Sequence, residues 1–387
     1  MLAVLSGPPT PLLTSILADY LFHQEPGITL YCGDALTVLR ELPDASVQTC
    51  ITSPPYWGLR DYGTAAWEGG DEACDHLGPP KATQAGFNRR YFGRDNVTAD
   101  KQSEVREPFR AVCGKCGARR VDAQLGLEPT PEAYVAALVE VFREVRRVLR
   151  EDGTLWINLG DSYTSTSGSG RCAKPQHTRG VATWDGAVRG IASGLKPKDL
   201  VGIPWRVAFA LQADGWWLRS DIIWAKPNPI PESVTDRPTK SHEYLFLLAK
   251  SERYYYDAEA IKEPAQDWGE RDRTNWKARD PRHNTSKPHT GGTNGDYSTA
   301  GRNRRSVWTV ATQPFPEAHF ATFPPDLIKP CVLAGSRVGD TVLDPFAGAG
   351  TTLYVAKELN RASVGIELNA DYCTLAVQRL RQEVLPL

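Results

Sequence analysis

Apolar residues recur with two periods along this chain, and the alternation of these periods predicts an α/β fold. Short apolar runs bounded by turn residues are typical of buried strands, and apolar positions three and four residues apart are typical of helices. The predicted strands are residues 28–31, 47–51, 154–159, 217–224, 242–248, 253–256, 341–343 and 363–366. The predicted helices are residues 35–42, 131–150, 204–213, 353–359 and 369–383. Strands that alternate with helices in this way favour a doubly wound sheet.

Two of these segments carry more detail than the others. Thr130 stands where it can cap the helix at residues 131–150, and Pro131 occupies its first position, where a missing N–H costs nothing. Apolar residues then line one face of that helix, which predicts that this face is buried. The runs at residues 242–248 and 253–256 are separated by a short polar break, and we expect them to form a hairpin.

The stretches without periodicity are basic. The net charge of the chain is −1, yet Lys and Arg outnumber Asp and Glu by ten to four in residues 81–120, by six to one in residues 165–198 and by ten to six in residues 262–305. Long irregular segments in a compact enzyme are usually functional or disordered. Local basic faces on a near-neutral protein fit contact with phosphates, and solvated basic loops are the alternative.

The composition is that of an ordinary globular protein. With 387 residues, 41% hydrophobic and 24% charged, the chain can bury one large core, or a core plus a smaller module. No apolar run approaches the roughly 20 residues of a membrane-spanning helix, so we expect no membrane partner. The first residues contain several prolines and no basic segment, so we expect no signal peptide and a cytoplasmic protein. Eight cysteines are too few for a disulfide framework.

A glycine-rich segment between a strand and a helix is the candidate cofactor site. It reads Asp344-Pro345-Phe346-Ala347-Gly348-Ala349-Gly350-Thr351-Thr352, and Glu367 follows Asp344 by 23 positions at the end of the next strand. Glycines let the backbone approach a ligand, and the helix N-terminus offers free N–H groups. An acidic residue at the second strand end is placed to bind a ribose diol.

This segment departs from the dinucleotide-binding fingerprint in two respects. Leu353 stands where the third glycine would be, and Asp344 would repel a pyrophosphate. A cationic sulfonium ligand with an amino-acid tail fits better, which points to S-adenosylmethionine. A nicotinamide-dependent oxidoreductase remains an alternative, although it leaves the next motif unexplained.

Ser53-Pro54-Pro55-Tyr56 ends the predicted strand at residues 47–51 and is the candidate catalytic segment. Adjacent prolines fix φ and remove two N–H donors, which leaves the Ser53 hydroxyl and the carbonyls of Ser53 and Pro54 as a rigid edge of acceptors. Two acceptors on the hydrogens of a base amino group would pull its nitrogen toward sp³ and aim the lone pair at a methyl group. Such chemistry needs positioning and in-line displacement. Tyr56 is placed to stack on a base taken out of the helix.

Together these two motifs resemble the amino-DNA methyltransferases of restriction–modification systems and bacteriophages. The catalytic tetrapeptide precedes the donor loop, as in the β arrangement, which is a circular permutation of the methyltransferase sheet. The resemblance covers residues 28–381. It implies a site-specific enzyme that takes S-adenosylmethionine as cofactor, flips a base out of double-stranded DNA and methylates its exocyclic amine. A homodimer and a cognate restriction endonuclease are the partners that the resemblance suggests.

The resemblance also implies roles for single residues. Asp34 matches the carboxylate that accepts a hydrogen bond from the adenine amino group of the donor, and Phe323 lies in the segment that contacts its methionine part. Residues 224–228 and 242–257 match the strand and hairpin that line the base pocket. The donor loop contributes Asp344, Phe346, Gly348, Gly350, Thr351, Thr352 and Glu367.

The first residue of the tetrapeptide bears on the target base. Ser53 favours N4 of cytosine, since the family tends to place Asp or Asn there for N6 of adenine. Methylation of C5 would need an activated thiolate, and the Pro330-Cys331 pair sits instead in the helix that leads to the donor loop. N6-adenine methylation therefore stays as the alternative, and related enzymes with this tetrapeptide also act on RNA or protein glutamine.

A second candidate site consists of Cys74, His76, Cys113 and Cys116. Three thiols and an imidazole with a Cys-x-x-Cys-Gly half are typical of a closed structural zinc site. The segment between the two pairs is basic and polar, and a metal would order it. Free thiols or a redox pair are the alternatives, and a non-catalytic zinc module that binds nucleic acid is a third class of function.

These observations predict five regions. Residues 1–66 form the first part of the methyltransferase core with the catalytic loop, residues 67–125 a zinc-binding insertion and residues 126–260 the central core. Residues 261–315 form a variable target-recognition segment, and residues 316–387 the part of the core that binds the methyl donor.

Overall fold

The structure is a computed structural model that describes residues 15–58, 66–71, 73–77, 112–121, 124–164, 176–178, 181–183, 187–188, 194–264, 301–313 and 323–381. The chain forms two compact units, one of Met1–Arg60 with Leu125–Leu387 and one of Asp61–Gln124. Most of the predicted target-recognition segment, residues 265–300, lies outside the described residues, and so do residues 81–111 of the first basic stretch.

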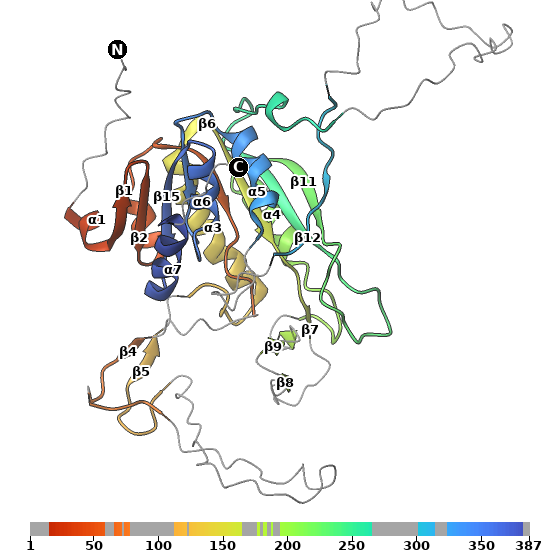
Figure 1. The fold of residues 1–387 in the computed structure, drawn as a ribbon. Coiled ribbons are helices and arrows are strands. Elements are labelled where there is room, and N and C mark those ends of the chain that lie inside the picture. The colour runs from red at the N-terminus through yellow and green to blue at the C-terminus, as the bar shows by residue number, and fades with distance from the viewer. Residues whose placement is uncertain are drawn as a thin grey trace, which may run out of the picture. The chain divides into compact units, whose positions relative to one another are not determined.

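Among the described residues, the larger unit is built on a nine-stranded mixed sheet (Figure 1). Its strands, in their order across the sheet, are β1 (Leu21–Glu25), β2 (Ile28–Cys32), β15 (Ala362–Glu367), β14 (Thr341–Asp344), β3 (Val47–Thr52), β6 (Leu149–Leu159), β12 (His242–Ala249), β11 (Trp217–Ala225) and β13 (Val307–Thr309). The five strands from β2 to β6 run parallel, whereas β1 and β12 are antiparallel to β2 and β6.

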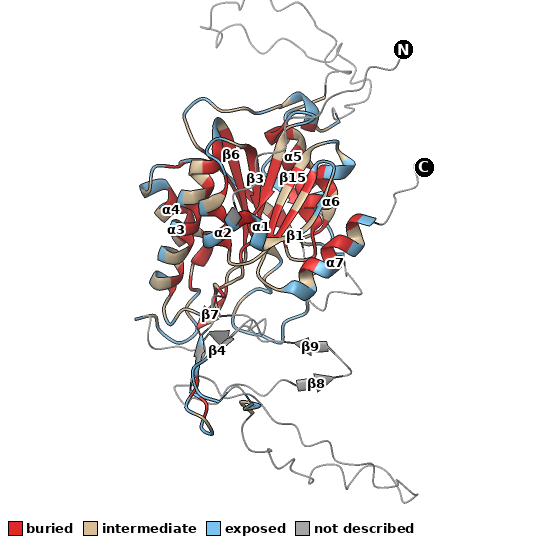
Figure 2. Ribbon diagram, turned by 90° about the vertical axis from the view of Figure 1, so that its left-hand side faces the viewer, coloured by how far each residue is buried: buried red, intermediate tan, exposed pale blue. Residues whose placement is uncertain are grey.

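Helices cover both faces of this sheet (Figure 2). One face carries α2 (Ala35–Glu41), α3 (Pro131–Val148) and α4 (Ile203–Ala213), with α1 (Ser15–Tyr20) against α2. The other carries α5 (Pro325–Gly335), α6 (Thr351–Glu358) and α7 (Ala370–Arg381). Among the described residues, the first layer buries one apolar cluster around Tyr134 and Phe142, and the second layer buries two, one around Trp156 and one around Leu353. The predicted doubly wound α/β fold is confirmed.

The sequence features predicted for α3 are present in the structure. The Thr130 hydroxyl accepts a hydrogen bond from the backbone N–H of Ala133 at 3.1 Å and caps α3, as predicted. The predicted apolar stripe is the buried face of α3. The helix ends at Val148, two residues earlier than expected, because Leu149 already pairs with Val47 as the start of β6.

The prediction of a strand at residues 253–256 is wrong. Its aromatic residues are fixed by other contacts: the N–H of Tyr255 donates to the Asp152 carbonyl at 2.9 Å, and the Tyr256 ring stacks on Trp156 with 6.4 Å between ring centroids. The hairpin partner of β12 is β11, which pairs with it from Trp217↔Ala249 to Ala225↔His242.

Short elements complete the description. They are the 3-10 helix η1 (Glu259–Ile261), the parallel pair β7 (Tyr163–Thr164) and β10 (Ala187–Val188), and the antiparallel pair β8 (Gln176–Thr178) and β9 (Val181–Thr183). In the smaller unit, β4 (Ala66–Glu68) pairs antiparallel with β5 (Arg119–Val121). Within the described ranges, no helix is both long and apolar enough to cross a bilayer.

The parallel strands place the predicted catalytic segment and the glycine-rich segment at one edge of the sheet. Because β2, β15, β14, β3 and β6 run in the same direction, the residues that follow them meet at their carboxyl ends. These ends lead into Gly33-Asp34, Glu367, the glycine-rich segment, Ser53 and Gly160. Ligands of open α/β sheets bind at this edge, so it is the place to look for a site.

Candidate functional site

Asp344 holds the glycine-rich segment from inside the sheet. Its side chain is 1% exposed, and its carboxylate accepts hydrogen bonds from the hydroxyls of Thr52 and Thr352, each at 2.6 Å, and from the N–H of Phe346 at 3.1 Å. Burial raises the pKa of Asp344 to about 6, against the effect of these three donors. The carboxylate therefore fixes the loop, and its two oxygens are engaged by protein donors.

The same residue joins the two predicted motifs. Thr52 immediately precedes Ser53 at the end of β3, and Asp344 ends the neighbouring strand β14, with Leu343 paired to Cys50. One buried hydrogen bond thus links two motifs whose bonded residues lie 292 positions apart in the sequence. Ser53 therefore follows directly on the residue that anchors the glycine-rich segment.

The two glycines of the segment have backbone conformations that favour glycine. Gly348 has a φ of +52° and Gly350 a φ of +75°. A Cβ at Gly350 would lie 2.8 Å from the Cβ of Ala376 on α7, so this glycine permits close packing of α6 and α7. A Cβ at Gly348 would meet no atom within 4 Å, so the space above Gly348 is open.

Two carboxylates stand on adjacent strand ends beside this open space. Glu367 accepts the N–H of Gly348 at 2.8 Å and the N–H of Asn369 at 2.9 Å, and burial raises the pKa of Glu367. The N–H of Gly33 donates to the Glu367 carbonyl at 2.9 Å, which brings Asp34 alongside. Oδ1 of Asp34 caps α2 through the N–H and hydroxyl of Thr37, at 2.9 and 2.7 Å.

The remaining predicted donor-site residues divide into two groups. Thr351 and Thr352 are 3% and 0% exposed, and their hydroxyls are engaged by Arg379 and by Asp344. What they offer a ligand is therefore their backbone, in the first turn of α6. Phe346 and Phe323 are partly exposed and pack against the cores on opposite faces of the sheet.

Hydrogen bonds fix the backbone of the catalytic segment at the residues that follow Ser53 and Pro54. The Tyr134 hydroxyl donates to the Pro55 carbonyl at 2.8 Å, and the Trp57 indole N–H donates to the Glu128 carbonyl at 2.9 Å. No hydrogen bond among the described residues ends on the carbonyl of Ser53 or Pro54. The prediction that these oxygens act as acceptors for a base amine therefore stays a prediction.

Sequence reasoning missed a polar cluster beside Ser53. The Tyr56 hydroxyl donates to Oε2 of Glu243 at 2.7 Å and lies 3.1 Å from the amide oxygen of Asn158. The Asn158 amide donates to the same Glu243 oxygen at 3.2 Å, and Lys226 forms an ion pair with the other oxygen. Burial, followed by the charge of Glu243, raises the pKa of Tyr56 well above its usual value, so its hydroxyl keeps its proton.

A second lysine at this edge was also missed. The ammonium nitrogen of Lys240 is buried and has no hydrogen-bond partner among the described residues. Burial lowers the pKa of Lys240, while the carboxylates of Asp161 and Glu243 raise it. Both lysines and Glu243 lie within or beside the segments that the resemblance assigned to the base pocket, but composition alone did not single them out.

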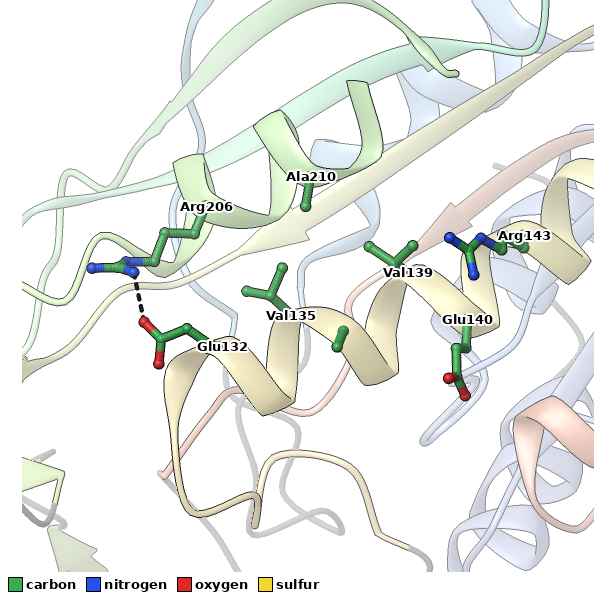
Figure 3. Close-up of a pocket in the computed structure, with 8 residues that line it drawn as sticks. Glu132, Val135, Val139, Glu140, Arg143, Arg206 and Ala210 are labelled. Carbon is green, nitrogen blue, oxygen red and sulfur yellow. Dashed lines mark hydrogen bonds and ion pairs between the residues drawn. The ribbon is translucent and has the colours of Figure 1, made fainter. Parts of the chain in front are cut away.

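An open groove elsewhere on the molecule is separate from this site. It has a volume of about 360 Å³ and lies between α3 and α4 (Figure 3). Val135, Val139 and Ala210 line it, and an ion pair between Glu132 and Arg206 closes one end at 3.0 Å. It contains none of the predicted site residues.

In the smaller unit, Cys74, His76, Cys113 and Cys116 are brought together. Their ligand atoms all lie within 4.8 Å of one another. The Sγ atoms of Cys74 and Cys113 are 3.7 Å apart, and Sγ of Cys116 is 3.5 Å from Nδ1 of His76. All three cysteines are free thiols. The N–H of Lys115 points at Sγ of Cys113 from 3.4 Å, and the His76 ring stacks on Trp67 with 4.5 Å between centroids.

Comparison with known proteins agrees with the fold and with the family that the two motifs resemble. Residues 47–378 match the model of a DNA methylase family, N6_N4_Mtase. The type II methyltransferase M.Cfr9I of Citrobacter freundii is 44% identical over 370 residues, which cover 94% of this chain and 93% of that protein. M.SmaI of Serratia marcescens is 41% identical and covers 90% of this chain and 89% of its own. The solved PvuII cytosine-N4-specific DNA methyltransferase superposes with a TM-score of 0.52 at 14% identity, over 93% of this chain and 88% of its own, a likeness of fold alone.

Proposed function

The chain belongs to the N6/N4 family of DNA methylases, the amino-methyltransferases of restriction–modification systems, and on this premise we propose that it transfers a methyl group from S-adenosylmethionine to N4 of a cytosine in double-stranded DNA. The observation that carries the proposal is the hydrogen bond at 2.6 Å between Thr52 and Asp344, because it sets the acceptors of Ser53 beside the open space over the glycine-rich segment. Cytosine is favoured by Ser53 in the first position of the tetrapeptide. N6 of adenine is the second candidate within the same family.

The residues around the open space fit S-adenosylmethionine. Glu367 and Asp34 offer acceptors for a ribose diol and an adenine amino group, and Gly348 leaves room for the ligand against the backbone. Phe346 and Phe323 present partly exposed rings, and the first turn of α6 presents backbone N–H groups. When bound, the donor supplies an electrophilic methyl group on a sulfonium sulfur.

The chain's own part in the reaction is to orient the target amine. The Ser53 hydroxyl and the carbonyl oxygen of Pro54 accept the two amino hydrogens, which directs the nitrogen lone pair at the methyl carbon. Because these acceptors lie at the sheet edge behind the loop, the target base must leave the DNA stack to reach them. The Tyr56 ring, held by its hydroxyl to Glu243, forms one wall of the place that the base would enter.

We expect nucleoside mass spectrometry to test this proposal directly. Duplex DNA of mixed sequence is incubated with the protein and S-adenosylmethionine, digested and analysed, and N4-methylcytosine is the expected product. N6-methyladenine would keep the enzyme class and transfer the assignment to the second candidate. The absence of either nucleoside, with single-stranded DNA and RNA also tried, would refute DNA amino-methylation as the activity.

Gly348→Ala is expected to weaken S-adenosylmethionine binding at least about tenfold, because the new methyl group enters the space assigned to the donor. The positive φ of +52° adds a stability cost of roughly 1–2 kcal/mol. Gly339→Ala is the matched control, since Gly339 has a φ of +84°, open space around it and a position on the turn before β14. Calorimetric titration and thermal unfolding separate the two effects. Equal affinity in both variants would place the donor elsewhere.

We also propose a structural zinc ion in the smaller unit. A tetrahedron with zinc–sulfur bonds of about 2.3 Å and zinc–nitrogen bonds of about 2.0 Å has sulfur–sulfur edges of roughly 3.8 Å and sulfur–nitrogen edges of roughly 3.5 Å. The distances of 3.7 Å between Cys74 and Cys113 and 3.5 Å between Cys116 and His76 match these edges, whereas a disulfide would bring two sulfurs much closer. Four N/S ligands leave no open position, so the role is structural.

Two protein partners follow from the family rather than from a surface of this chain. A homodimer and a cognate restriction endonuclease are both proposals on that basis. Double-stranded DNA is the proposed substrate, and the basic residues outside the core are the proposed phosphate contacts.

A further inference from the structure

The charged cluster beside Ser53 joins three separate elements through one carboxylate. Glu243, at the start of β12, accepts the Tyr56 hydroxyl from the catalytic loop, the Asn158 amide from the end of β6 and the Lys226 ammonium from beyond β11. Lys226 is itself held over the Trp224 ring, 4.3 Å from its centroid. The side chains of Glu243 and Lys226 are 17% and 19% exposed, so this ion pair is largely removed from water.

A partly buried ion pair is a costly way to stabilise a fold. Desolvation of the two charges offsets much of their attraction, and apolar residues of similar size often stabilise as well or better. The ion pair instead fixes the orientation of the Glu243 carboxylate, because both of its oxygens accept from donors with fixed geometry. The orientation of this carboxylate matters because it accepts from Tyr56, which belongs to the proposed catalytic tetrapeptide.

Glu243 orients the Ser53 hydroxyl through two successive hydrogen bonds, one between Glu243 and Tyr56 and one between Tyr56 and Ser53. Tyr56 has a single hydroxyl proton, and the Glu243 carboxylate accepts a hydrogen bond from it at 2.7 Å. The Tyr56 oxygen can then only accept from Ser53, whose Oγ lies 3.4 Å away, at the long end for such a bond. The Ser53 proton is drawn toward Tyr56, and its oxygen presents lone pairs to the base.

We propose that Glu243 is a positioning residue for methyl transfer, which fixes the proton directions of Tyr56 and Ser53 so that Ser53 faces the target amine as an acceptor. The proposal rests on the function proposed above and adds a residue to it. Packing supports the arrangement, since a Cβ at Gly160 would lie 2.4 Å from Cε2 of Tyr56, so the ring rests directly on the Gly160 backbone and its hydroxyl cannot swing away.

Glu243→Gln is expected to lower kcat about 10- to 100-fold, the range of one charged hydrogen bond, while KM for DNA and the affinity for S-adenosylmethionine change by less than about threefold. The neutral amide is a weaker acceptor than the carboxylate, so the Tyr56 hydroxyl is no longer held to one direction. A fraction of the molecules then donates from Tyr56 to Ser53, which turns the Ser53 proton toward the base. The matched control is Glu144→Gln on α3, where a carboxylate of similar exposure, 23%, pairs with Arg147 away from the site. Its kcat should equal that of the wild type.

A double-mutant cycle with Tyr56→Phe tests whether Glu243 acts through Tyr56. Because the phenylalanine has no hydroxyl, Glu243→Gln should cost less than about threefold in kcat in that background. Full additivity, or an unchanged kcat in Glu243→Gln alone, overturns the proposal. If Glu243→Gln fails to fold, Tyr56→Phe alone decides, since an unchanged kcat there also overturns it. The wild type is first shown to methylate DNA, so failure of the proposed function is recognised separately.

Discussion

Ser53→Ala is expected to lower the rate of methyl transfer by about 100- to 1,000-fold, comparable to the loss of one pre-positioned hydrogen-bond group in other active sites. The alanine removes the acceptor that would draw one amino hydrogen out of conjugation with the base ring. The Pro54 carbonyl remains, since Tyr134 and Trp57 hold the backbone of the loop independently of the Ser53 side chain. The result is therefore a slow enzyme rather than an unfolded one.

Single-turnover transfer of labelled methyl groups measures this loss, and calorimetric titration with S-adenosylmethionine shows whether the donor site is intact. Ser46→Ala is the matched control, because the Ser46 hydroxyl donates only to the Pro43 carbonyl at 2.7 Å in the turn before β3. Both variants should bind S-adenosylmethionine like the wild type. If Ser53→Ala retains a rate within a few-fold of the wild type, the acceptor is the backbone alone and the role of Ser53 has to be abandoned.

The parts of the site that could be predicted from the sequence are those fixed by local chemistry. The prolines after Ser53 and the positive φ angles at Gly348 and Gly350 are properties of consecutive residues. The same holds for the Thr130 cap and the apolar stripe of α3. Parallel strands then bring their carboxyl ends to one edge, so the meeting of the two motifs follows from the fold class.

What could not be predicted depends on register between distant strands. Glu243 faces Tyr56 because β12 pairs with β6 at Tyr244↔Leu159 and with β11 at Trp224↔Glu243, and a shift of one residue would point it to the other face. The internal use of Asp344 by Thr52 and Thr352 is equally non-local. The false strand at residues 253–256 has the same origin, since its aromatic pattern reflects packing on Trp156 rather than pairing.

Loss of the proposed zinc ion is expected to unfold the smaller unit while leaving the larger unit folded. Among the described apolar residues of the smaller unit, only Cys113 and Ala118 are buried, so the described part of this unit has almost no apolar core. Small modules of this kind derive their stability from the metal, with apparent binding free energies of about 10–16 kcal/mol for structural zinc. The larger unit keeps its own apolar clusters and should show an unchanged main unfolding transition.

Cys116→Ser tests this expectation, with Asp75→Asn as the matched control, since Asp75 lies between two proposed ligands and pairs with Lys115 at 2.5 Å without being one. Elemental analysis should find about one zinc per chain in the wild type and in Asp75→Asn, and much less in Cys116→Ser. Limited proteolysis should cut Cys116→Ser, and the chelated wild type, within residues 61–124. A wild type that is purified without metal, resists cleavage there and gains nothing from added zinc would mean that the three thiols and the imidazole lie together for another reason. Because this readout is cleavage and metal content, it stands whether or not the smaller unit contributes to DNA binding.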